Sequence, residues 1–255
     1  MLTTLFDSEK SIFYHIGKFV SWHKDIFSKP ENWKMYYKEI IRQMYDIGIG
    51  SLTIVLVISI FIGAVTAIQF SYQLAGTMIP EWYIGYVVRD MMIIELAVTI
   101  TCLVLAGKVG SNMAAEIGGM RQKEHIDAME IMGVNTSSYI IMPKLIAAII
   151  VIPLLVTLSA IIGIFGGYFA SVYSGILTHA EYVKGLRSFF IPYNVFVMFV
   201  KATVFAYILT SVSCYQGYFV KGGSIELGQA STRAVVFSDI LILVADYLIA
   251  VVLTS

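Results

Sequence analysis

Long stretches without charged side chains constrain this sequence more than any other feature. The clearest stretch runs from Ile47 to Leu74 and contains no Asp, Glu, Lys or Arg. A helix needs about 20 apolar residues to cross a bilayer, so this stretch is long enough for one span. Hydrophobic residues make up 58% of the chain, whereas a soluble domain is about half apolar or less. The sequence therefore predicts an all-α integral membrane protein.

Four further apolar stretches predict four more spans. The second stretch carries charges at its start and middle, among them Glu95. The third contains Pro143 and Pro153 and is too long for one straight span, which predicts a kinked or tilted helix. We thus expect an N-terminal segment, residues 1–46, and a five-span domain, residues 47–255. The predicted spans cover residues 47–74, 84–106, 139–173, 193–215 and 234–253.

Lysine and arginine are unevenly distributed between the two sides that these spans define. Seven of them precede the first span, three lie in the loop between spans two and three with Lys144 just beyond it, and two lie in the loop between spans four and five. The other side has only Lys184 and Arg187, with Arg89 near a span end. Positively charged loops remain on the cytoplasmic side of a membrane. The N-terminus is therefore expected to be cytoplasmic and the C-terminus to lie outside.

The N-terminal segment is amphipathic. Apolar residues around Ile12–Trp22 and again around Trp33–Ile41 alternate with lysines at helical spacing, and Lys29-Pro30 separates the two groups. Aromatic and basic side chains on an amphipathic helix are typical of the membrane interface. We favour an interfacial helix over the alternative, a packed cytoplasmic cap, because so short a cap would bury little surface.

The loop between spans two and three contains a second amphipathic pattern. Residues 112–132 carry apolar side chains at helical spacing and a polar face of mixed sign. Gly133 is expected to end this helix and Asn135 to begin a turn. A lipid surface would favour an excess of lysine, so the mixed charges favour docking to a protein. The expected apolar stripe is Met113, Ile117, Met120, Ala128 and Ile131, and the polar stripe is Glu116, Lys123, Asp127 and Glu130.

The same loop carries a resemblance to a known family. Ala115–Asn135 reads AEIGGMRQKEHIDAMEIMGVN and resembles the coupling segment of the MlaE (YrbE) permeases. The resemblance extends from about Lys29 to the C-terminus. In span two the family pattern RELGP is replaced by Ile94-Glu95-Leu96-Ala97-Val98, so its arginine and proline are missing. Other matching segments are Arg42-Gln43-Met44-Tyr45, Phe61-Ile62-Gly63 with Gln69, Gly107-Lys108-Val109-Gly110, Lys221-Gly222-Gly223, Gly228–Val236 and Asp246.

The resemblance implies a homodimeric permease in a bacterial inner membrane. It further implies a separate cytoplasmic ABC ATPase that holds ATP and magnesium, an Mce-domain protein like MlaD on the periplasmic side, and phospholipid as the transported molecule. This chain itself is expected to bind no cofactor. Independently of the resemblance, no GxxxxGK[ST] motif occurs in the sequence, so nucleotide chemistry by that route must come from a partner.

Other classes of protein fit the sequence less well. A formal net charge of zero argues against a nucleic-acid partner, and Cys102 and Cys214 lie in apolar runs without the spacing of a metal site. A membrane-embedded enzyme would need a nucleophile with a base or an acidic metal cluster, yet all four histidines lie outside the predicted spans. An ion-driven secondary transporter could use the intramembrane charges as a relay, but five spans do not divide into equal halves.

Three groups of residues are candidates for function. Glu116, Arg121, Glu124 and Asp127 are expected to contact the ATPase or to orient the coupling helix, and the alternative is that Arg121 and Glu124 only stabilise that helix as an i,i+3 pair. Phospholipid is expected at a dimer interface between spans one, two and five, where an apolar lining and a few polar atoms are needed; the alternative for each residue is ordinary packing. The predicted lipid-binding residues are Thr66, Gln69, Phe70, Gln73, Leu74 and Glu95.

The third group is an intramembrane ion pair. Counted at about 1.5 Å per residue from the predicted span ends, Lys201, Asp246 and Glu95 lie at similar depths. Because an unpaired charge in a bilayer is costly, Lys201 is expected to pair with Asp246, with Glu95 as the alternative or third partner. A structural bridge is the favoured interpretation. The alternative interpretation is a charge that faces the lipid headgroup or shifts during transport, and this interpretation applies best to Glu95.

Overall fold

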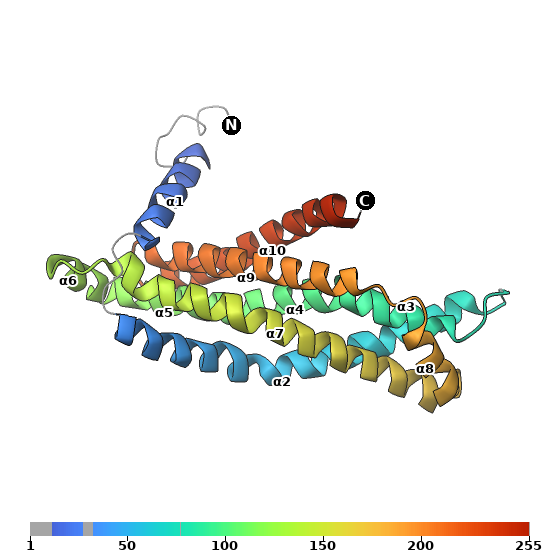
Figure 1. The fold of residues 1–255 in the computed structure, drawn as a ribbon. Coiled ribbons are helices and arrows are strands. Elements are labelled where there is room, and N and C mark those ends of the chain that lie inside the picture. Colours follow the sequence, from blue (N-terminus) through green and yellow to red (C-terminus); the bar gives the residue numbers. More distant parts are fainter. Residues whose placement is uncertain (1–11, 28–32, 77, 255) are drawn as a thin grey trace.

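The computed structural model describes residues 12–27, 33–76 and 78–254, and within these ranges the chain contains helices and no strand. Figure 1 shows most of the long helices aligned in one elongated bundle. The elements are α1 (Ile12–Phe27), α2 (Trp33–Leu74), α3 (Tyr83–Met91), the π-helix η2 (Met92–Leu96), α4 (Ala97–Leu105), the π-helix η3 (Ala106–Gly110), α5 (Ser111–Gln122), α6 (His125–Ile131), α7 (Thr136–Tyr173), α8 (His179–Arg187), α9 (Pro192–Tyr218) and α10 (Ser224–Thr254).

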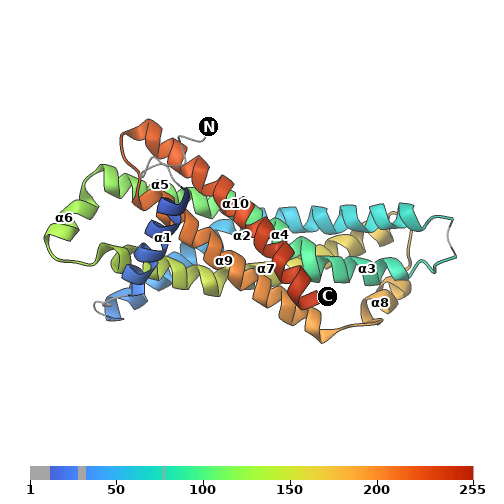
Figure 2. The ribbon, with the colours of Figure 1, turned by 90° about the horizontal axis from the view of Figure 1, so that it is seen from above.

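Five of the described helical stretches are long and apolar enough to cross a membrane, which confirms the predicted all-α membrane fold. Short elements mark the two ends of the bundle: α6 and α1 lie at one end, and α8 lies at the other (Figure 1). We call these the α6 end and the α8 end. In Figure 2, α10 runs obliquely over the bundle. The membrane-spanning stretches are Tyr36–Leu74, Tyr83–Gln122, Thr136–Tyr173, Pro192–Tyr218 and Ser224–Leu253.

The boundary expected at residue 46 falls inside one continuous helix. α2 begins at Trp33, so the second amphipathic stretch of the N-terminal segment is the first part of this helix rather than a separate element. Its sequence up to Ile47 contains neither Gly nor Pro, the two residues that most disfavour a helix interior. Charged side chains end an apolar run, but they do not end a helix whose exposed face can be solvated.

Span two also continues beyond its predicted end at Ala106. The chain remains helical from Tyr83 to Gln122 and passes through two π-helical segments. Lys108 lies in the second of these, η3, and its Nζ donates to the carbonyl of Gly50 on α2. A π-turn inserts an extra residue into a helix without ending it, so the chain accommodates Gly107 and Lys108 in a single rod.

The helix expected over residues 112–132 is two helices. Glu124 has a left-handed backbone, with φ 60°, and separates α5 from α6. This break changes which side chains face inward: Ile126 is buried, whereas Ile131 is 88% exposed. The predicted apolar stripe therefore holds in α5, at Met113 and Ile117, and fails in α6.

The end of this loop agrees with the sequence. Gly133 has φ 80°, the left-handed conformation that favours glycine after a helix. Asn135 caps α7, and its side chain accepts a hydrogen bond from the Ser138 backbone N–H at 3.2 Å. α7 then runs unbroken past Pro143 and Pro153 to Tyr173.

Glycines let α2 and α7 approach closely. A Cβ at Gly63 would collide with the backbone of Gly163, and one at Gly166 would collide with the backbone of Ile60. Close backbone approach through small residues is a general way to join membrane helices. Gly63 and Gly166 thus act in the packing of these two spans.

α1 packs against the protein at the α6 end. Trp22 is 3% exposed, and its ring centroid lies 5.6 Å from that of Tyr215 on α9. The Asn135 side chain also donates to the Asp25 carbonyl at 3.0 Å. On the same helix Val20 remains exposed, so α1 combines a packed face with free apolar surface. Lys29-Pro30 lies outside the described residues.

Candidate functional site

Three charged side chains meet in the middle of the bundle. Lys201 on α9 is fully buried, and its Nζ lies 2.6 Å from Asp246 Oδ1 on α10 and 2.7 Å from Glu95 Oε2 on η2. Thr99, one turn beyond Glu95, donates its hydroxyl to Asp246 Oδ2 at 2.9 Å. The structure therefore brings together the three charges whose depths agreed in the sequence, with Glu95 as a third partner. We call Glu95, Lys201 and Asp246 the charge triad.

The two carboxylates of the charge triad are not equivalent. The Asp246 side chain is 9% exposed and fixed by both Lys201 and Thr99, whereas the Glu95 side chain is 43% exposed. Glu95 lies in a π-helical turn, a feature often found at functional sites. Glu95 is thus the member that can meet a ligand from outside the protein.

The candidate lipid-binding residues of span one all lie in the part of α2 near the α8 end. Thr66 is buried, and its hydroxyl donates to the Ile62 carbonyl at 2.7 Å, so it is engaged within its own helix. Gln69 and Gln73 are exposed, and Phe70 and Leu74 are half-buried. Among the described residues, the hydrogen bonds and the ion pair of Glu95 go to Thr99 and Lys201. The structure thus presents two separate polar features, at mid-bundle and near the α8 end.

α2 and α10 expose more apolar surface than the other spans. Within the most apolar stretch of each helix, 33% of residues are buried in α2 and 17% in α10, against 56% in each of the other three spans. Asp246 faces the bundle from α10, while Val244, Tyr247 and Leu248 around it are exposed. These two helices offer the surface on which lipid or another membrane helix can pack.

The loop at the α6 end is organised by Arg121. Its guanidinium lies 2.7 Å from Asp127 and 3.5 Å from Glu130, so it ties α5 to α6. Tyr218 on α9 donates its hydroxyl to Glu130 at 3.0 Å. The alternative i,i+3 pair between Arg121 and Glu124 is not among the ion pairs of the described residues, because the backbone turns at Glu124 and leaves that side chain exposed.

Glu116 lies apart from the other coupling candidates. Its carboxylate accepts from the Lys144 ammonium at 2.6 Å, and the same ammonium donates to Gln43 Oε1 at 3.1 Å. Lys144 is almost completely buried in α7. Glu116 therefore connects α5 to α7 and α2, whereas Arg121 and Asp127 shape the α5–α6 corner.

Sequence reasoning missed several residues that position these sites. Arg89 is buried and donates to the carbonyls of Leu186 and Ser188, at 2.6 and 2.8 Å, which holds the segment after α8 in place. α8 itself was not expected, although its capping box, Thr178 with Glu181, is visible as a T-x-x-E pattern. Thr101 and Ser159 join α4 to α7 by a hydrogen bond of 2.8 Å.

Among the groups outside the spans, His23 and Glu181 have lowered pKa values with clear causes. Burial among the aromatic rings of α1 lowers the pKa of His23 below its usual 6.5. Hydrogen bonds from the backbone N–H and hydroxyl of Thr178 lower the pKa of Glu181. The docked α1 therefore favours a neutral His23, and the α8 cap favours an ionised Glu181.

Comparisons with known proteins agree with this architecture. A family model described as Permease MlaE matches residues 40–252. A probable ABC transporter permease protein of Rickettsia bellii is 38% identical over 234 residues, which are 92% of this chain and 90% of that protein. The intermembrane phospholipid transport system permease protein MlaE of Haemophilus influenzae is 30% identical over 229 residues, 89% of this chain and 87% of that protein. The chloroplastic protein TRIGALACTOSYLDIACYLGLYCEROL 1 of Arabidopsis thaliana is 29% identical over 222 residues, 85% of this chain and 62% of that protein.

Proposed function

Because the chain belongs to the MlaE permease family, we propose that it is the membrane subunit of an ABC transporter that moves phospholipid between the inner membrane and a periplasmic carrier. The family makes the chain a multi-pass membrane permease rather than an enzyme. The Haemophilus influenzae relative is named for phospholipid transport, and that substrate class is carried over to this chain as part of the proposal.

The α6 end is assigned to the cytoplasm in this proposal. The loops that meet there carry most of the lysines and arginines outside the spans, which is the pattern of cytoplasmic loops. α10 begins at this end, so the C-terminus is assigned to the periplasmic side (Figure 1).

The observation that carries the proposal is the surface of α6. Ile131 and Met132 are 88% and 71% exposed, and they lie beside the charged side chains of the α5–α6 corner. Exposed apolar side chains next to mixed charges fit a groove in a protein partner. An ABC ATPase that binds ATP and magnesium is the partner this function requires. α6 would pass the movement of the ATPase through the Arg121–Asp127 contact into α5, which is continuous with span two.

The transport path is placed at the exposed faces of α2 and α10. Their low burial supports a homodimer in which two copies enclose a lipid cavity between these helices. Gln69 and Gln73 would provide polar atoms near the periplasmic side, and Glu95 would provide a charge at mid-depth. An Mce-domain protein would exchange phospholipid with this cavity at the α8 end.

Co-purification tests the proposal. The full chain, extracted from its native membrane in a mild detergent, is expected to carry an ATPase subunit in stoichiometric amount. Replacing Ile131 and Met132 by serine should release that subunit, while serine in place of the exposed Val20 on α1 should not. Recovery of the permease without any nucleotide-binding subunit under all mild conditions would contradict the proposal.

The charge triad favours one competing function, an ion-driven secondary transporter, because intramembrane charges can relay ions. The two functions differ in their energy source. ATP-dependent lipid movement that persists after the ion gradients are collapsed supports the ABC permease, and movement that stops with the gradients supports the rival.

A further inference from the structure

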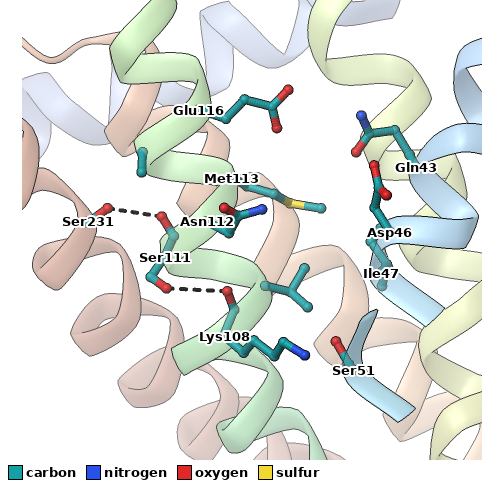
Figure 3. A pocket seen from close by; sticks show the side chains of 12 residues that line it. Gln43, Asp46, Ile47, Ser51, Lys108, Ser111, Asn112, Met113, Glu116 and Ser231 are labelled. Carbon is teal, nitrogen blue, oxygen red and sulfur yellow. Dashed lines mark hydrogen bonds between the residues drawn. The ribbon is translucent and has the colours of Figure 1, made fainter. Parts of the chain in front are cut away.

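A polar pocket opens at the α6 end, far from the candidate residues near the α8 end. It has a volume of about 630 Å³ and lies between α2, η3 with α5, and α10. This size is in the usual range for small-molecule sites. Figure 3 shows side chains of α5 facing those of α2 across the pocket. Its lining residues include Asp46, Ser51, Lys108, Asn112, Glu116 and Ser231.

Two opposite charges in this pocket have no ionic partner. Neither Asp46 nor Lys108 forms an ion pair with any described residue, although the Lys108 ammonium donates to the Gly50 carbonyl. Glu116, by contrast, is neutralised by Lys144 at 2.6 Å. The lining therefore offers one cation and one carboxylate that are both exposed and that form no ion pair within the described residues.

The lining also contains a buried hydroxyl without a hydrogen-bond partner. Ser51 is fully buried and lines the pocket, and its Oγ has no hydrogen-bond partner within the described chain. Figure 3 shows the Lys108 side chain reaching toward α2 at the level of Ser51. An enclosed polar atom without a partner is costly, so a ligand oxygen that accepts from Ser51 would satisfy it.

The pocket lies at the depth of lipid headgroups. The charge-free run of α2 starts at Ile47, directly after Asp46, and Lys108 is the first charge after Glu95 in span two. The run from Ile47 to Leu74 is about 42 Å long at 1.5 Å per residue, more than the ~30 Å hydrocarbon core, so its first turns reach the interface. Exposed apolar side chains such as Ile54 and Phe237 continue from the pocket along α2 and α10 toward mid-membrane.

From these observations we propose that this pocket binds the headgroup of a zwitterionic phospholipid from the cytoplasmic leaflet, with its phosphate at Lys108 and Ser51 and its ammonium at Asp46. A headgroup that is only anionic would satisfy Lys108 and leave Asp46 unpaired, so the pocket selects phosphoethanolamine over phosphoglycerol. The acyl chains lie against the exposed faces of α2 and α10. This site rests on the proposed function, since it supplies lipid to the same transporter from the other leaflet.

The test measures which lipid the pocket captures. The complete transporter is placed in nanodiscs that contain equal amounts of phosphatidylethanolamine and phosphatidylglycerol, with a photoreactive residue at Asn112, an exposed position of the lining. A second sample carries the photoreactive residue at Ile49, which is exposed on α2 but does not line the pocket. We expect Asn112 to enrich phosphatidylethanolamine and Ile49 to report the bulk ratio.

Variants assign the selectivity to the two charges. Asp46→Asn should lower phosphatidylethanolamine capture at Asn112 roughly two- to fivefold, the range for an exposed ion pair, and leave phosphatidylglycerol unchanged. Lys108→Met should lower capture of both lipids. The proposal would be overturned if the ratio of captured phosphatidylethanolamine to phosphatidylglycerol were equal at Asn112 and Ile49. It would also be overturned if Asp46→Asn kept the preference for phosphatidylethanolamine.

Two further measurements distinguish this site from a site for a soluble ligand and from the proposed lipid cavity near the α8 end. Excess soluble glycerophosphoethanolamine should not compete, and complete competition would identify a soluble metabolite as the ligand and refute the lipid assignment. A photoreactive residue at Gln73 tests the proposed function by itself. Capture at Gln73 with no enrichment at Asn112 refutes the inner-leaflet site alone.

Discussion

Lys201 Nζ lies 2.6 Å from Asp246 Oδ1, and this ion pair ties α10 to α9 inside the membrane-spanning bundle. α10 buries only 17% of its most apolar stretch, the lowest share among the five described spans. Lys201 has no exposed surface, and the Asp246 carboxylate also accepts from Thr99. The pair therefore positions α10, whose outer face is part of the proposed transport path.

The first prediction concerns the stability of this pair. Lys201→Met leaves Asp246 buried without its counter-charge and should lower the free energy of unfolding by about 3–5 kcal/mol. Combining Lys201→Met with Asp246→Leu should recover more than half of that loss, because it removes the stranded charge. Thermal unfolding of the purified permease in one detergent compares the three proteins. A double variant no more stable than Lys201→Met would contradict a structural pair.

A second prediction separates Glu95 from Asp246. The Glu95 side chain is 43% exposed and that of Asp246 is 9% exposed, so Glu95→Gln should lower the stability less than Asp246→Asn does. Lipid transport should fall nevertheless, because the charge that faces outward is lost. Asp246→Asn is the matched control and should mainly destabilise the protein. Normal transport by Glu95→Gln would leave Glu95 with a structural role only.

The spans themselves could be predicted from the sequence because a bilayer requires uninterrupted apolar length. The ends of the helices could not be predicted in the same way. Asp46 and Lys108 end apolar runs, yet the helices continue through them, since an exposed helix face tolerates charge and a π-turn absorbs an extra residue. The break at Glu124 was also hidden, because left-handed backbone at a glutamate has no clear sequence signature.

The site could be predicted in part. Depth along each span was enough to bring Lys201, Asp246 and Glu95 together, because three charges at one level of a bilayer must find each other. Pairing across the bundle was harder to foresee. Lys144 counted in the sequence only as a positive charge, whereas in the structure it is buried and engages Glu116. Its place inside an apolar run was the signal that a partner existed.

A third prediction tests the close contact of α2 and α7. Gly63→Leu would place a side chain against the backbone of Gly163, where even a Cβ collides, and should prevent stable accumulation of the protein. Gly228→Ala on α10 meets nothing within 4 Å and should stabilise its helix by roughly 0.5–1 kcal/mol. Membrane abundance and melting temperature report both effects. Normal abundance of Gly63→Leu would show that the two helices do not pack as described.

A fourth prediction is pH dependence at α1. Burial lowers the pKa of His23, so the docked helix favours the neutral ring, and docking is strongest above the usual pKa of 6.5. As the pH falls below that value, His23 becomes protonated when α1 is undocked. Protonation stabilises the undocked state, so docking weakens. Hydrogen exchange of α1 should therefore be faster at about pH 5.5 than at about pH 7.5, after correction for intrinsic rates. His23→Phe should remove the difference, and an unchanged difference would assign it to another group.

The fifth prediction concerns the α5–α6 corner. Reversing both charges, with Glu124→Lys and Asp127→Lys, should lower lipid transport more than ATP hydrolysis, because the contact that transmits movement is altered. Glu124→Gln removes the charge and keeps the length of the side chain, so it isolates the electrostatic contribution. Lys24→Glu on the exposed side of α1 is the control and should have no effect. Equal loss in the control would point to a general charge effect.

The measurement that tests the central claim most directly is ATP-dependent movement of phospholipid by the reconstituted complex. The transporter is placed in vesicles with a fluorescent phospholipid, and its transfer to or from the purified carrier protein is followed with and without ATP. The account predicts transfer that requires ATP hydrolysis, persists without ion gradients, and is lost when Glu124 and Asp127 are both replaced by lysine. Transfer at the same rate without ATP, or transfer that follows an imposed ion gradient, would contradict it.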